Sequence, residues 1–179
     1  MLNWKPIVGA ACLVLAPMLS AQAESLRYEK IYSQIREVDN RLILTIDETG
    51  LVNLHRPGFM PHAGTYEWQL SASELEQLWQ DIAPEQWLAV DMQLLKRNLD
   101  QRSQSDKFYS SDSDVSRLEW NDGRGPARAS EISGLAGLNT LFPQIAELQQ
   151  LTATEQRLWQ WLQTQLNHQL ELAQQGARS

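Results

Sequence analysis

The chain has 179 residues and a formal net charge of −7, from 15 basic and 22 acidic side chains. Nucleic acids and anionic membrane surfaces need basic patches, so this acidic balance argues against both as partners. The one cysteine, Cys12, lies in the apolar segment near the start, which leaves the rest of the chain without disulfides, thiol nucleophiles or thiolate metal sites.

The first 23 residues have the pattern of a cleaved secretory signal peptide. One positive charge, Lys5, precedes an apolar stretch over 7–19, and Ala21 and Ala23 are the small residues that signal peptidase reads. The stretch is shorter than the roughly 20 residues of a membrane-spanning helix. We therefore predict cleavage after Ala23, export to the periplasm or medium, and no membrane insertion of the mature chain.

The mature chain begins with residues that predict a β-hairpin and one uncertain element. Leu26–Val38 fits a helix by the spacing of its apolar side chains and a strand by its β-branched and aromatic content. We favour a strand, because the hairpin that follows needs a partner. That hairpin pairs 41–47 with 51–56, and Gly50 is suited to the loop between them.

A loop rich in proline and glycine, 57–65, separates the hairpin from a further strand at Tyr66–Leu70. Ser71 and Glu74 then have the spacing of a capping box. An apolar stripe at helical spacing follows and ends at Pro84. The pattern predicts one well-defined central helix.

The next segment is polar, and the last third is helical. We expect a short apolar segment at Trp87–Val90, a polar loop at about 93–114, and a second hairpin of 115–120 with 124–130 around an Asp-Gly turn. Two C-terminal helices are predicted. One begins at Pro143 and ends near Gln150, and a longer one, at about 153–174, is capped by Thr152 and Glu155 and buries a leucine stripe.

These elements predict a single α+β domain over residues 24–179. An antiparallel sheet of hairpins would carry one packed central helix and the C-terminal helices.

Patterns of catalytic or metal-binding residues are missing. His55, His62 and His168 lack the spacing of a zinc site, and Asp112-Ser113-Asp114 lacks the glycine and glutamate of a calcium loop. Neither a Gly-x-Ser-x-Gly elbow nor a phosphate-binding glycine loop is present. The sequence therefore predicts a protein that is not an enzyme and that uses neither metal nor cofactor.

Aromatic residues remain as candidates for recognition. Phe59, Met60 and His62 lie in the 57–65 loop, where a mobile apolar tip could meet a partner. Six tryptophans follow residue 23, and Trp159 points partly away from the leucine stripe, so it would either face a partner or pack on a neighbouring element; we favour packing.

The order of hairpin, Leu-Ser-x-x-Glu-Leu helix, short apolar segment, strand pair and Pro-Gln-Ile-x-x-Leu helix resembles small exported bacterial α+β domains, including emfourin-type inhibitors of thermolysin-like proteases. The matching stretches are Leu42–Leu54, Leu70–Ile82, Val115–Asn121 and Pro143–Leu148. The resemblance implies a binding or inhibitory role without catalysis and transfers no functional residue.

Three hypotheses for function follow. The first is a non-catalytic binding or interaction module of the cell envelope, whose partner is another envelope or secreted protein. The second is an inhibitor of a secreted or periplasmic protease that presents the loop of Phe59, Met60 and His62. The third is a binder of a small ligand or sugar that uses tryptophans.

Overall fold

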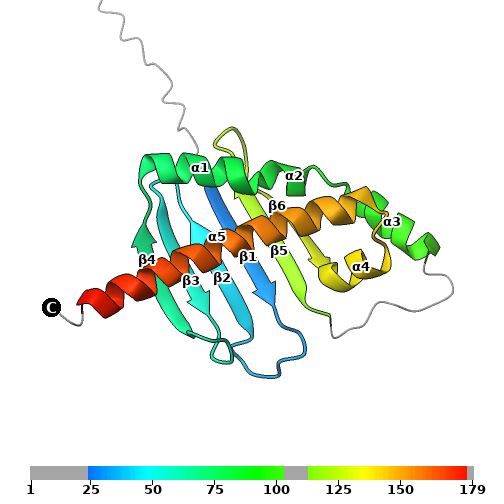
Figure 1. Ribbon diagram of the computed structural model, residues 1–179. Helices are drawn as coiled ribbons and strands as arrows, with labels where there is room; N and C mark the ends of the chain where they lie inside the picture. The colour runs from blue at the N-terminus through cyan, green and yellow to red at the C-terminus, as the bar shows by residue number, and fades with distance from the viewer. Residues whose placement is uncertain (1–23, 103–112, 177–179) are drawn as a thin grey trace, which may run out of the picture.

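The computed structural model describes residues 24–102 and 113–176, and the predicted signal peptide lies outside them. Its centre is a six-stranded antiparallel sheet in the order β4-β3-β2-β1-β5-β6 (Figure 1). The strands are β1 Ser25–Ile31, β2 Arg41–Ile46, β3 Leu51–Arg56, β4 Gly64–Gln69, β5 Val115–Asn121 and β6 Arg128–Ser133. The first strand thus pairs with both hairpins and joins them into one sheet.

Helices cover one face of this sheet, which confirms the predicted α+β class (Figure 1). They are α1 Ala72–Ile82, α2 Pro84–Leu88, α3 Met92–Arg102, α4 Leu135–Leu141 and α5 Ala146–Gly176. The long α5 crosses the strands, with α1 and α2 along one side of it and α4 near its N-terminal end (Figure 1). Arg157 of α5 donates to the Ile82 carbonyl and to the Gln86 side chain, which fastens α5 to the α1–α2 corner.

Alternation along the strands explains why one face is covered and the other is open. In β2 and β3 every second side chain is buried beneath the helices, and the residues between them are polar or only half-buried. Such alternation is typical of an antiparallel sheet with one solvated face. On that open face Glu29 pairs with Arg41 at 3.0 Å and with Arg27 at 3.8 Å.

The N-terminal predictions are largely confirmed. The ambiguous segment is strand from Ser25 to Ile31, so the helical alternative is wrong, and the chain turns away at residue 32. Gly50 closes the β2–β3 hairpin with φ +82°, and a Cβ there would lie 2.9 Å from the Leu70 carbonyl oxygen. The second hairpin, β5–β6, is also confirmed, although β6 begins four residues later than expected.

The predicted capping box at the start of α1 is present. Ser71 accepts a hydrogen bond from the Glu74 amide, and the Glu74 carboxylate accepts from the Ser71 amide at 2.8 Å. The helix ends at Ala83, whose backbone is left-handed, and Pro84 then opens α2. This turn places the short α2 against β5 and β6.

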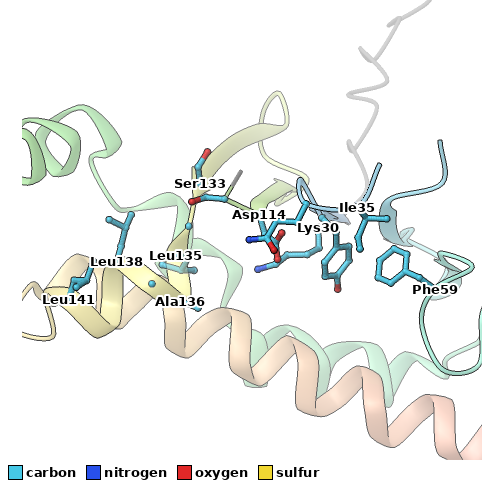
Figure 2. A pocket seen from close by; sticks show the side chains of 14 residues that line it. Lys30, Ile35, Phe59, Asp114, Ser133, Leu135, Ala136, Leu138 and Leu141 are labelled. Atoms are coloured by element: carbon cyan, nitrogen blue, oxygen red, sulfur yellow. The ribbon is translucent and has the colours of Figure 1, made fainter. Parts of the chain in front are cut away.

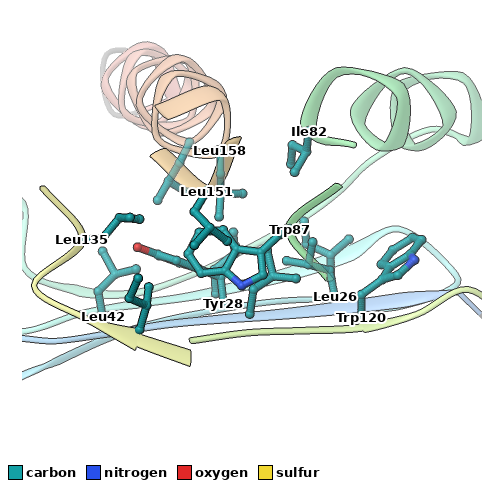
Figure 3. Close-up of a cluster of buried hydrophobic side chains, with 14 of the residues drawn as sticks. Leu26, Tyr28, Leu42, Ile82, Trp87, Trp120, Leu135, Leu151 and Leu158 are labelled. Carbon is teal, nitrogen blue, oxygen red and sulfur yellow. The ribbon is translucent and has the colours of Figure 1, made fainter. Parts of the chain in front are cut away.

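Trp87 of α2 is the largest fully buried side chain. It lies between the α5 residues Leu151 and Leu158 and the sheet residues that include Tyr28 (Figure 3). Truncating a buried aromatic residue costs about 3–5 kcal/mol because a cavity remains. Trp87 therefore joins the helical layer to the sheet.

Two predictions for the second half of the chain are wrong. The expected polar loop at 93–114 is helix over 92–102, because Leu95 and Leu99 bury one side of α3; residues 103–112 lie outside the described structure. The two expected C-terminal helices are one continuous helix, α5. Thr152 and Glu155 therefore lie inside a helix and do not cap one. None of the helices in the described ranges is both long and apolar enough to cross a membrane.

Candidate functional site

A cleft of about 390 Å³ opens at the end of the sheet where β1 finishes and β5 begins. One wall is α4, with Leu135, Leu138 and Leu141. The opposite wall comes from the loops 32–40 and 57–63 and carries Ile35 and Phe59 (Figure 2). Lys30 and Asp114 lie between the two walls (Figure 2). The site is therefore a cleft of mixed lining, with apolar side chains on both walls and charged groups between them.

Lys30 is held by a polar cluster that we call the Glu155 network: Tyr28, Lys30, Ser116 and Glu155. Oε1 of Glu155 accepts from the Tyr28 hydroxyl at 2.5 Å, from Ser116 Oγ at 2.6 Å and from Lys30 Nζ at 3.0 Å. Lys30 Nζ also donates to Ser116 Oγ at 2.8 Å. Because the network is nearly enclosed, the ion pair and its hydrogen bonds compensate for lost hydration and hold the ammonium in one position.

The sheet register explains how residues distant in sequence meet here. Lys30 and Ser116 are partners across β1 and β5, and Tyr28 is two residues before Lys30 on the same face. Glu155 reaches them from α5, which crosses this face of the sheet. The network therefore depends on the docking of α5 on β1 and β5.

A serine and a lysine in contact can form a catalytic dyad, but the geometry here does not suit one. Ser116 has no exposed surface, and its hydroxyl donates to Glu155. Lys30 is paired with the same carboxylate, so its amine is not free to act as a base toward the serine. The pair can position a charge in the cleft, whereas it cannot present a nucleophile to a substrate.

Tyr32 lies on the cleft wall next to this charged centre. Burial raises the pKa of its phenol to about 12, and the negative charges of Asp114 and Glu155 add to the shift. Burial likewise raises the pKa of Tyr28 well above its ordinary value, with Glu155 as the second cause. Both phenols are therefore neutral hydrogen-bonding groups near pH 7.

Lys30 and Asp114 both retain binding capacity. An ammonium has three N–H donors, and within the described part of the chain Lys30 directs two of them to Ser116 and Glu155. The Asp114 carboxylate makes no hydrogen bond or ion pair with any described residue, and no ion pair joins it to Lys30. The cleft thus offers one cationic and one anionic group to a bound molecule.

The loop wall of the cleft is fastened at several points. Arg56, which is buried, donates to the Pro61 carbonyl at 2.8 Å, and the Gly58 amide donates to Asp39 at 3.1 Å. Phe59 stacks edge-on against Tyr32 with ring centroids 5.1 Å apart. These contacts hold Phe59 in place beside the cleft.

On the open face of the sheet, Asp39, His55 and Thr65 form a chain. Asp39 Oδ1 lies 2.7 Å from His55 Nε2, and His55 Nδ1 lies 3.4 Å from Thr65 Oγ1. The hydrogen bond from His55 lowers the pKa of Asp39. The order resembles a nucleophile, base and orienting acid, but the three lie exposed on a flat sheet face rather than in a pocket. Asp39 instead ties the 32–40 loop to β3.

The predicted interaction residues do not form one cluster. Phe59 lines the cleft, Met60 packs partly against the core, and His62 is exposed and does not line the cleft, while its carbonyl accepts from Tyr66. Trp159 of α5 packs on the core, edge-on to Tyr28 at 6.4 Å. Of these four residues, Phe59 is the one placed at the cleft.

The principal residues of the cleft were not predicted. The sequence pattern places Glu155 in a helix cap, Asp114 in an Asp-Ser-Asp run that lacks the rest of a calcium loop, and Lys30 in a segment that fits a strand or a helix. Lys30 is a charged residue on the buried side of a strand, which is a signal that sequence alone could have given once the strand was assigned. The pairing of Lys30 with Glu155 joins positions 125 residues apart and required the fold.

A second groove, of about 600 Å³, lies between α3, β6 and α4 and is lined by Leu95, Leu99, Ile132 and Leu138 together with surface charges. It is larger, but no buried ion pair borders it within the described residues. Groups of three or more potential metal ligands are likewise absent from the ranges 24–102 and 113–176. The first cleft is therefore the better candidate site.

No protein-family model and no curated protein sequence matches this chain.

Proposed function

We propose that this chain is an exported, non-catalytic binding protein, and that the cleft beside α4 holds a small molecule. The observation that carries the proposal is the Lys30 ammonium, which the Glu155 network fixes in a cleft that has both apolar and polar walls. Binding sites for small molecules are concave and mostly apolar, with a few polar groups in fixed positions. The cleft matches that description in volume and in lining.

The arrangement supports binding more than catalysis. In the Glu155 network the ammonium is held by a carboxylate, Ser116 is buried, and Tyr28 is neutral near pH 7, as is Tyr32 on the cleft wall. The network therefore presents no exposed nucleophile to the cleft. The same groups suit the orientation of a ligand, because rigid polar contacts lose little entropy on binding.

The proposal is tested by recovering the ligand. The protein is purified from its own cells under native conditions and analysed by native mass spectrometry, as wild type and as Ala136→Trp. Ala136 is exposed and lines the cleft, so tryptophan there fills the site and leaves the core unchanged. Thr140→Trp is the control, since Thr140 is exposed on the same helix and does not line the cleft.

We expect a bound small molecule in the wild type and in Thr140→Trp, and its loss in Ala136→Trp. If a molecule is retained equally by all three proteins, its site is elsewhere. If none of the three retains a molecule, the cleft is not a high-affinity site and the proposal fails.

Export is part of the proposal and rests on the pattern of the first 23 residues. N-terminal sequencing of the protein recovered from the periplasm or medium checks it. The expected mature chain begins at Glu24, and a full-length chain confined to the cytoplasm would contradict export.

A second candidate is protease inhibition through the 57–63 loop. The observation that favours it is that Phe59 stays 37% exposed while Arg56 and Asp39 hold the loop, and inhibitors present rigid loops of this kind. Incubation of the mature protein with a panel of secreted metallo- and serine proteases tests it. Slowing of one protease by the wild type but not by Phe59→Ser is expected for an inhibitor, and no slowing of any would reject this candidate.

A further inference from the structure

We propose that the ligand of the cleft is a small amino-acid or peptide zwitterion with an apolar side chain, whose carboxylate meets Lys30 and whose ammonium meets Asp114. This inference rests on the proposed function, because it assigns a chemical class to the molecule in the same cleft. Three features of the site carry it: the charge pair, the apolar walls and the volume.

The charge pair is the most selective feature. Lys30 has a third N–H donor, and the Asp114 carboxylate has no hydrogen-bond or ion-pair partner within the described residues. No ion pair joins Lys30 to Asp114 among the described residues, and a ligand that carries both charges could contact each of them. A ligand with a carboxylate alone would be opposed by Asp114 and Glu155, and one with an ammonium alone would be opposed by Lys30.

The surroundings of Asp114 suit an ammonium group. Tyr32 lies beside it on the cleft wall, and its neutral phenol oxygen can accept a hydrogen bond. The positive charge of buried Arg56 lowers the pKa of Tyr32. The Arg56 guanidinium donates to the Pro61 carbonyl, however, and does not line the cleft. The anionic side of the cleft is thus the side nearer Tyr32.

The walls indicate what lies between or beyond the two charges. Leu138 and Leu141 lie on one side of the charged groups, and Ile35 and Phe59 lie on the other (Figure 2). A volume of about 390 Å³ is near the lower end of the range for small-molecule sites. An apolar amino acid or dipeptide is of a size that fits it.

The test compares three forms of one dipeptide: leucyl-leucine, its N-acetyl derivative, which lacks the ammonium, and its C-terminal amide, which lacks the carboxylate. Each is titrated by calorimetry into wild type, Ala136→Trp, Asp114→Asn and Asp81→Asn. Asp81 is an exposed carboxylate of α1 outside the cleft and serves as the matched control.

We expect leucyl-leucine to bind wild type and Asp81→Asn at least about tenfold more tightly than either blocked form, as charged hydrogen bonds require. In Asp114→Asn the preference over the acetylated form should fall to about twofold or less. Ala136→Trp should bind none of the three. Circular dichroism of each variant establishes that the fold is retained.

Equal binding of all three forms, or an unchanged preference in Asp114→Asn, would overturn the assignment of a zwitterion. So would the absence of binding by any form to the wild type. Neither result would affect the proposed function, which is decided separately by recovery of a bound molecule from native protein and its loss in Ala136→Trp.

Discussion

Glu155 is the residue that holds the polar network beside the cleft together. A single carboxylate oxygen accepts from a tyrosine, a serine and a lysine, and the residue is almost fully buried. If Glu155 lost its negative charge, the Lys30 ammonium would lose the carboxylate with which it is paired. Breaking one member of a buried ion pair is costly for this reason.

We expect Glu155→Gln to lower the free energy of unfolding by about 3 kcal/mol, because it leaves Lys30 charged and unpaired. Chemical denaturation monitored by tryptophan fluorescence measures the loss. Glu171→Gln is the control, since Glu171 is exposed on the same helix, and it should change stability by less than about 0.5 kcal/mol. Equal effects of the two substitutions would show that the network contributes nothing specific.

The Tyr32 phenol makes the stability of the folded protein depend on pH in the alkaline range. In the folded protein the pKa of the Tyr32 phenol is about 12, whereas its ordinary value is 10.0. The unfolded chain therefore releases the phenol proton at a lower pH than the folded protein does. The stabilisation is fully present below about pH 10 and is lost as the pH rises through about 12.

The stability of the wild type should therefore fall more steeply between about pH 10 and 12 than that of Tyr32→Phe. Urea denaturation at a series of pH values measures both slopes. Parallel curves for wild type and Tyr32→Phe would contradict the assignment.

At the scale of elements, the same sequence signal has opposite meanings at two places. Ser71 and Glu74 form a capping box because the chain before them is an extended strand that must turn into α1. Thr152 and Glu155 have the same spacing, but the chain before them is already helical, and Glu155 turns instead to the sheet. Local spacing does not distinguish the two cases, whereas tertiary contacts do.

Alanine substitutions at Ser71 and Thr152 should therefore have different effects on the free energy of unfolding. Ser71→Ala removes a real cap and should lower the free energy of unfolding by about 1 kcal/mol. Thr152→Ala should leave stability unchanged or raise it by up to about 0.5 kcal/mol, because alanine is the better helix former and the Thr152 hydroxyl is buried without a partner in the described structure. Thermal unfolding of both variants compares them directly. A loss of about 1 kcal/mol in Thr152→Ala would indicate a helix boundary at that residue.

At the scale of the whole molecule, local patterns predicted the fold class, both hairpins and α1. Strand alternation, the Gly50 turn and the capping box each depend on residues close together in sequence. The pattern did not predict α3, because two leucines among polar residues bury only a narrow stripe. It also missed the cleft, because α4, two loops and the ends of β1 and β5 form it together. Phe59 alone among the cleft residues was proposed beforehand, for its place in a loop.

We propose that the charged cleft beside α4 is the binding site of this protein. The most direct test is chemical-shift mapping by two-dimensional ¹H–¹⁵N NMR, with the small-molecule fraction of the cell envelope added to the labelled mature protein. We predict saturable shifts of amides around Lys30, Asp114 and Ala136, and none of these in Ala136→Trp. Shifts confined to the open face of the sheet, or no shifts at any concentration, would contradict the claim.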